Sequence, residues 1–113
     1  MIVFGDLTVD ECKQKLIDSE HLDFETFKAT ALAGLERWQE DYDSFLAWGF
    51  FLVDRVGKAA EQNDDELLKY YAMILGPIFD YARENLANEN YQVFQVKMIA
   101  KMDSVMEKAA KKK

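Results

Sequence analysis

The chain is poor in the residues that break or bend a helix. Its 113 residues include a single proline and five glycines, and no two of the glycines are adjacent. Both residue types interrupt helices and shape turns, so their scarcity favours helices joined by short connections. The scattered glycines also leave no glycine-rich loop of the kind that cradles phosphates.

Cysteine and long apolar runs are also scarce. Cys12 is the one cysteine, which excludes an internal disulfide and predicts a reducing, cytoplasmic location. The first residues lack the basic start of a secretion signal and soon reach Asp6, so we expect no such signal. The longest apolar run, Phe45–Val53, is far shorter than the roughly 18 residues of a membrane span, and we expect no membrane partner.

The sequence offers little for metal binding or catalysis. Two-metal helical bundles use a Glu-x-x-His motif on each of two helices, and His21 is the only histidine here. Cys12 falls on the apolar side of its expected helix, where cysteine behaves as a small hydrophobe. No spacing brings His21 beside it as a base. We therefore predict no metal, no cofactor, no catalytic residues and no enzymatic activity.

Charge is unevenly distributed along the chain. The net charge is −7, and acids outnumber bases everywhere except in residues 91–113. Phosphate neutralisation by Lys and Arg supplies most of the affinity for nucleic acids, so we expect no nucleic-acid partner. The acidity has two interpretations that the sequence leaves open, namely solubility and recognition of a basic protein.

The most informative stretch is Leu35–Val56, which contains the run Phe45–Val53 with its four aromatic residues. Apolar residues recur at steps of three or four from Phe24 to Val56, which predicts helix. One unbroken helix would be about 51 Å long at ~1.5 Å per residue. Because a small domain is narrower than that, the segment either breaks near Glu40–Ser44, with Ser44 as a new cap, or overhangs and is covered by a second subunit. We favour a kinked or split helix.

Further helices are indicated on both sides of this stretch. The segment Thr8–Glu11 reads as a capping box that opens a helix to about Ser19, and Asp23 is a suitable N-cap for the next helix. Residues 58–63 read as a loop, and 63–66 as the cap of a helix that Gly76–Pro77 kinks without ending. After a turn at 88–90, the last helix is expected over 91–109. Its Met98, Met102 and Met106 form a ridge that suits either a core or an adaptable surface.

These patterns predict an all-α fold, an antiparallel bundle of four to five helices with a central aromatic-rich helix. Residues 1–113 are expected to form a single helical domain. Half of the residues are apolar, which is enough for one core at this length.

The central helix has large aromatic residues on two sides. Phe50 and Phe51 lie opposite the expected core stripe of Trp38, Phe45 and Leu52, because successive helical residues are about 100° apart. Exposed apolar patches are rare on monomers. The sequence therefore predicts a partner-binding surface formed by Ala47, Phe50, Phe51 and Asp54, unless the N-terminal segment 2–4 covers it.

From this surface the sequence predicts a non-catalytic protein–protein interaction module of inhibitor, immunity or adaptor type, acting as a homodimer. The alternative is a bundle that holds an apolar small molecule among its many aromatic residues. An enclosed apolar cavity of roughly 300 Å³ or more would favour the alternative.

Overall fold

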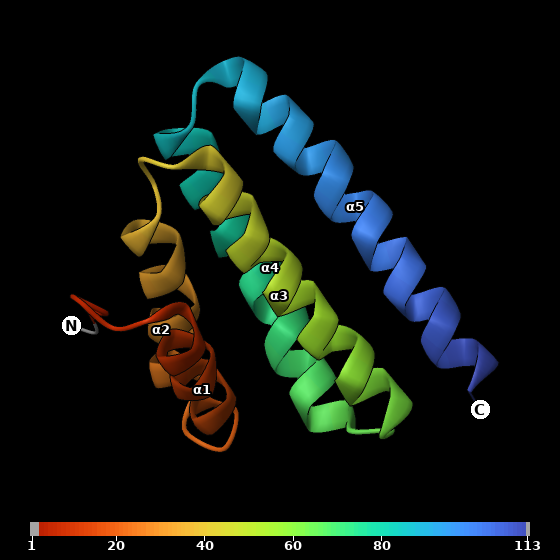
Figure 1. Cartoon of the computed structure of the whole chain (residues 1–113). Helices are drawn as coiled ribbons and strands as arrows, with labels where there is room; N and C mark the ends of the chain where they lie inside the picture. Colours follow the sequence, from red (N-terminus) through yellow and green to blue (C-terminus); the bar gives the residue numbers. More distant parts are fainter. Residues whose placement is uncertain (1–2, 113) are drawn as a thin grey trace.

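The computed structural model describes residues 3–112, which form five helices and no strand. They are α1 (Val9–Ser19), α2 (Phe24–Arg37), α3 (Tyr42–Glu61), α4 (Asp65–Asn85) and α5 (Asn88–Lys111). Each helix runs against the one before it, so α3 and α5 run parallel with α4 as the return between them (Figure 1). The predicted all-α antiparallel bundle is confirmed.

The central position belongs to α3. This helix packs against α2, α4 and α5, whereas α1 packs chiefly on α2. Helix α5 lies along one edge of the molecule and rests mainly on α3, with a smaller contact to α4 (Figure 1). The aromatic-rich helix is therefore central, as predicted.

Four helices begin at a side chain that caps them. Thr8 and Glu11 form the predicted capping box at α1, and Asp23 caps α2 by accepting from the backbone N–H of Thr26. Asp41 and Asp64 cap α3 and α4 in the same way. Each cap satisfies a backbone donor that the first helical turn leaves unpaired.

The long apolar segment is split, as favoured from the sequence. Helix α2 ends at Arg37, and α3 begins at Tyr42. The cap of the second helix is Asp41 and not Ser44, whose hydroxyl donates to the Asp41 carboxylate at 2.9 Å. A carboxylate placed just before the helix meets the positive end of its dipole, which favours Asp41 over the serine.

Two predicted boundaries are wrong. The expected loop at 58–63 begins too early, because α3 continues through Gly57 to Glu61 and turns at Asn63, whose φ is 55°. The expected turn at 88–90 is instead the first turn of α5. At the end of α3, packing extends the helix: a Cβ at Gly57 would lie 3.0 Å from the Cβ of Val105, so the glycine permits the close approach of α5.

The core runs the length of α3. Phe45 is fully buried between the rings of Tyr81 and Phe94. Trp48 is buried as well, and its indole N–H donates to the Ala31 carbonyl at 2.8 Å. Trp38, expected in the core stripe beside Phe45, is only half-buried at the end of α2. The spacing of three and four continues through the turn between α2 and α3, where the chain reverses direction. For this reason it placed Trp38 incorrectly on the same stripe as Phe45.

Candidate functional site

The partner-binding surface predicted from the sequence lies on one side of α3. Ala47 and Asp54 are exposed, while Phe50 and Phe51 are half-buried. Ala47 and Asp54 each lie three or four residues from both phenylalanines, so the four positions share one side of the helix. We call them the α3 surface.

Lysine side chains from two other helices cover its aromatic rings. The Nζ of Lys101 in α5 lies 5.8 Å from the Phe50 ring centroid and 3.1 Å from a carboxylate oxygen of Asp54. The Nζ of Lys13 in α1 lies 5.3 Å from the Phe51 ring centroid. Lysine stems bury apolar surface while keeping the charge in water, and the ammonium is attracted to the ring face. Less apolar area is therefore left open here than the sequence suggested.

The N-terminal segment takes a neighbouring place. Phe4 is buried with its ring edge-on to Trp48, at a centroid distance of 5.6 Å. Trp48 in turn contacts Phe51, at 5.3 Å between centroids. The segment thus supports the aromatic cluster from the side of Trp48. Ile2, which was expected to take part, lies outside the described residues.

A second apolar surface follows the outer side of α5, and the sequence analysis missed it. Four large apolar side chains are exposed there, with exposed fractions of 44% at Val93, 68% at Val96, 57% at Ile99 and 41% at Met106. We call these four residues the α5 face. The signal was present in the sequence, because the four lie off the expected core stripe. A core stripe alone accounts for an amphipathic helix, so the pattern did not single out a second apolar face on α5.

A shallow apolar hollow of about 120 Å³ adjoins this face between α4 and α5, lined by Val53, Leu75, Phe79, Met98, Ile99, Met102 and Asp103. The three methionines of the predicted ridge differ in how deeply they are buried. Met98 is buried in the core, Met102 is half-buried and Met106 is exposed. The core and surface interpretations of the ridge therefore apply to its opposite ends.

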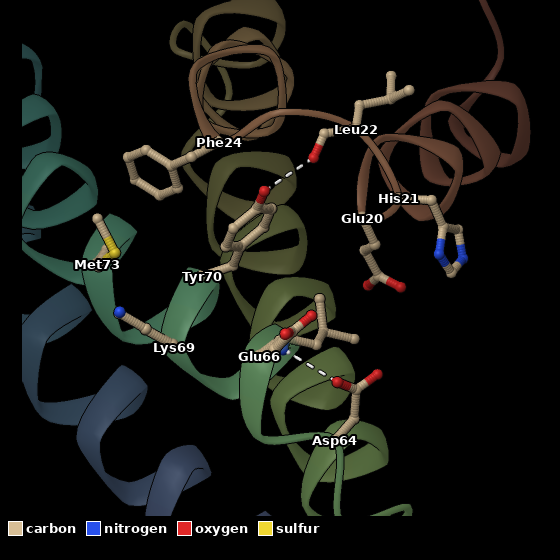
Figure 2. Close-up of a pocket in the computed structure, with 10 residues that line it drawn as sticks. Glu20, His21, Leu22, Phe24, Asp64, Glu66, Lys69, Tyr70 and Met73 are labelled. Atoms are coloured by element: carbon tan, nitrogen blue, oxygen red, sulfur yellow. Dashed lines mark hydrogen bonds between the residues drawn. The ribbon is translucent and has the colours of Figure 1, made fainter.

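A larger pocket lies elsewhere, between the α1–α2 turn and the first half of α4 (Figure 2). Its volume is about 710 Å³, and its lining mixes Phe24, Tyr70 and Met73 with charged side chains. The Tyr70 hydroxyl of α4 donates to the Leu22 carbonyl in the α1–α2 turn at 2.9 Å (Figure 2). The pocket is open to solvent and is lined by several charged side chains, so it differs from the enclosed apolar cavity expected for a small-molecule binder.

The wall of this pocket contains a buried carboxyl group. The Glu20 side chain is 2% exposed and accepts from Arg55 Nε at 2.9 Å, Arg55 Nη2 at 2.7 Å and the Tyr71 hydroxyl. The bond to Glu20 raises the pKa of Arg55, and burial together with Glu20 raises the pKa of Tyr71. Because its partners satisfy this carboxylate from within the chain, its arrangement is structural.

Groups that could perform chemistry are isolated from one another. Cys12 is fully buried, and burial raises the pKa of its thiol, which lowers the share of reactive thiolate. Across residues 3–112, no three His, Cys, Asp or Glu side chains are grouped as metal ligands would be. None of the five helices is long and apolar enough to cross a membrane.

Comparison with known proteins gave no match to a protein-family model, a curated protein or a solved structure.

Proposed function

We propose that this protein is a non-catalytic protein–protein interaction module of the inhibitor, immunity or adaptor type. The α5 face carries the proposal, since its four large apolar side chains are all exposed to solvent on a single helix. Contiguous apolar surface on a soluble protein usually marks an interaction site. The free, buried thiol of Cys12 fits a cytoplasmic setting for this role.

The α5 face is held rigidly, which suits recognition. Helix α5 lies close against α3 at two glycines, where an added Cβ would be 2.8 Å from Met98 Sδ at Gly49 and 3.0 Å from Val105 Cβ at Gly57. Such close packing fixes the rotation of α5 and therefore the direction of its outer side chains. A surface ordered before binding loses less conformational entropy when a partner arrives.

The α3 surface remains part of the proposal as a second contact region. This surface borders α5 at the ion pair between its Asp54 and Lys101 of α5. A partner on the α5 face that extends toward α3 would meet Lys101 and Phe50 at this border. A second copy of this chain, the predicted homodimer, is one such partner.

The alternative of an apolar small-molecule ligand has weaker support. The apolar hollows measure about 120 Å³ beside Ile99 and about 100 Å³ beside Ala47, below the roughly 300 Å³ at which ligand pockets begin. The 710 Å³ pocket is large enough but carries charged side chains from both walls. The small volumes of the apolar hollows and the charged lining of the large pocket favour protein binding over binding of an apolar small molecule.

Site-specific photo-crosslinking in the producing cells tests the proposal. A photoreactive phenylalanine analogue replaces Val96 on the α5 face, Phe50 on the α3 surface or, as a control, the exposed Glu84 of α4. Discrete protein adducts are expected from position 96 and none from position 84. Adducts from position 50 alone would move the function to the α3 surface. A lack of adducts at both 96 and 50 would contradict a protein-binding role for these surfaces.

A further inference from the structure

We infer that the pocket between the α1–α2 turn and α4 receives an arginine side chain of a basic protein. Its lining comes from that turn, the start of α2 and the first part of α4 (Figure 2). No residue of the α5 face or of the α3 surface belongs to this lining, so the pocket is a further binding site, beyond the function proposed above. We call it the turn pocket.

The turn pocket lies in an acidic part of the surface. Residues 18–25 and 63–66 supply its carboxylates and contain no lysine or arginine. A surface of one sign attracts partners of the opposite sign and suppresses binding of others. The acidic residues of the two segments are Asp18, Glu20, Asp23, Glu25, Asp64, Asp65 and Glu66.

Two carboxylates of the lining are available to a cation. Glu20 already has a partner in Arg55, at 2.7 Å. Asp64 and Glu66 are exposed, and no salt bridge formed within residues 3–112 includes either of them. Asp64 uses Oδ1 to accept from the backbone N–H of Leu67 at 3.1 Å, which leaves Oδ2 for a partner.

The other part of the lining is apolar and suits the stem of a long side chain. The rings of Phe24 and Tyr70 meet edge to face, with 5.4 Å between their centroids. Leu22 and Met73 also line the turn pocket, and their exposed fractions are 51% and 48%. Large apolar side chains exposed beside unpaired carboxylates fit a ligand that carries a cation on an apolar stem.

The aromatic wall is in place before a partner arrives. Besides Phe24, the Tyr70 ring contacts Phe27, at 5.3 Å between centroids, and its hydroxyl donates to the Leu22 carbonyl at 2.9 Å. These contacts fix the ring and tie α4 to the α1–α2 turn. Little conformational entropy is therefore lost at this wall on binding.

Arginine fits this lining better than lysine. A guanidinium stacks on aromatic faces, bonds carboxylates in a fork and is weakly hydrated, whereas the lysine ammonium holds its water strongly. The volume of about 710 Å³ exceeds the need of one side chain, so residues beside the arginine enter as well. Lys69 and His21 are the basic side chains of the lining. The charge of Lys69 opposes the incoming cation and limits the affinity.

Titration with two peptides, followed by amide NMR of the full chain, tests the inference. The probe is acetyl-Leu-Arg-amide, and its control is acetyl-Leu-citrulline-amide, in which a neutral urea replaces the guanidinium. We expect a dissociation constant of about 1–10 mM for the arginine peptide and at least about fivefold weaker binding of the control. Resonances of Leu22, Tyr70 and Met73 should shift, and that of Val96 should not.

Three results of this titration would overturn the inference. They are equal binding of the two peptides, shifts that are confined to the α5 face, and no shifts up to roughly 20 mM of the arginine peptide. A lysine peptide that binds more tightly than the arginine peptide would overturn the choice of arginine.

Charge variants test the same site from the side of the protein. Asp64→Asn with Glu66→Gln should raise the dissociation constant of the arginine peptide about three- to tenfold. Asparagine caps a helix as well as aspartate does, so α4 should keep its start. Lys69→Gln should lower the dissociation constant about two- to threefold. Circular dichroism and thermal unfolding check that the variants stay folded.

A second pair of substitutions controls for net charge. Glu84→Gln with Glu89→Gln removes the same two charges, and position 84 is about 27 Å along α4 from position 66, at ~1.5 Å per residue. This pair should leave the dissociation constant within about twofold, because charges farther apart than ~8–10 Å are largely screened at physiological salt. Equal weakening by both pairs would show that net charge alone attracts the peptide, and would overturn the turn pocket as its site.

The outcomes for the turn pocket and for the α5 face are independent. If the arginine peptide does not bind and position 96 still gives photo-adducts, the inference is wrong and the proposed function is still supported. If the peptide binds at Tyr70 and positions 96 and 50 give no adducts, the turn pocket is supported and the role proposed for the other two surfaces is contradicted.

Discussion

At the scale of single residues, two phenylalanines five positions apart in α3 differ in how they are buried. Phe45 has rings on two sides, from Tyr81 and Phe94, and is fully buried. Phe50 is half-buried with the ammonium of Lys101 over its ring. An aliphatic stem can move aside, whereas ring packing in a core cannot close a vacated volume. The same substitution should therefore have different costs at the two positions.

We expect Phe45→Ala to lower the free energy of unfolding by about 3–5 kcal/mol, as aromatic truncations in cores do. Phe50→Ala is the matched control and should cost about half as much or less, because its side chain is only half-buried. Urea unfolding followed by circular dichroism measures both changes. Equal costs would mean that the rotation of α3 about its axis differs from the structure described.

The burial of Phe45 followed from sequence spacing alone, but that of Trp48 did not. Spacing places a residue on a face of its own helix. Trp48 is buried because the chain reverses between α2 and α3, which brings the Ala31 carbonyl of α2 to the indole N–H of Trp48. The partner is 17 positions away in the sequence, and no local pattern indicates it. The α5 face was missed for a related reason, since the core stripe already explained an amphipathic helix.

At the scale of elements, the glycines show which helices touch most closely. At Gly34 of α2, an added Cβ would lie 1.9 Å from the Trp48 ring, so this glycine admits the indole between α2 and α3. At Gly76 of α4, an added Cβ meets nothing within 4 Å. Both glycines are helical, and Gly76 also precedes Pro77, whose ring disfavours a helical backbone for a residue with a Cβ at position 76.

We predict unequal effects for the two alanine substitutions. Gly76→Ala should change the free energy of unfolding by less than about 1 kcal/mol, because the lower backbone entropy of alanine is opposed by contact of its Cβ with the ring of Pro77. Gly34→Ala should destabilise it by about 1–3 kcal/mol or more, because the indole must move and its hydrogen bond to Ala31 is strained. Thermal unfolding of both variants measures the effects, and tryptophan fluorescence should change only in Gly34→Ala. Stabilisation by both substitutions would show that α2 does not approach Trp48 this closely.

Helix starts were easier to predict than helix ends. The starts at Thr8 and Asp23 are encoded by a side chain that bonds the first backbone donors, so a few neighbouring residues are sufficient to locate them. The end of α3 depends on α5, which packs at Gly57 and keeps the helix regular where glycine alone suggested an end. The start of α5 at Asn88 has no side-chain cap bond, and therefore no local signal marks it.

At the scale of the whole molecule, one cluster joins the two parts of the chain. Glu20, at the end of α1, bonds Arg55 of α3 and Tyr71 of α4. The α1–α2 hairpin is thereby attached to the three helices that follow it. Removing a proton from this cluster would leave a second negative charge beside a buried carboxylate, which is costly at low local dielectric.

We expect the protein to lose stability at alkaline pH. The pKa of Tyr71 is raised in the folded state by burial and by Glu20, above an unfolded value of about 10. Between the two values the unfolded chain releases the proton that the folded chain keeps, so the free energy of unfolding falls by about 1.4 kcal/mol per pH unit for this group. The stability that Tyr71 contributes is complete below about pH 10 and is lost above it. Urea unfolding at a series of alkaline pH values measures the slope.

Tyr71→Phe is the control for this prediction. The variant keeps the ring and lacks the titrating hydroxyl, so its alkaline slope should be shallower than that of the wild type. A residual slope is expected, because burial also raises the pKa values of Tyr42 and Tyr81. An unchanged slope in Tyr71→Phe would show that the alkaline sensitivity originates outside the cluster.

The parallel placement of α3 and α5 also has a consequence for the order of folding. Helix α5 packs on α3 around Gly49 and Gly57; we call this region of α3 the seat of α5. Its residues leave the ribosome about 50 positions before α5 is complete. A synthesis rate of roughly 5–20 residues per second leaves that seat uncovered for several seconds. The α2–α3–α4 part can form its hairpins during this interval, while the aromatic side of α3 waits for Phe94 and Met98. Docking of α5 is then the last step of folding, and the α5 face reaches its final orientation only when the rest of the core is closed.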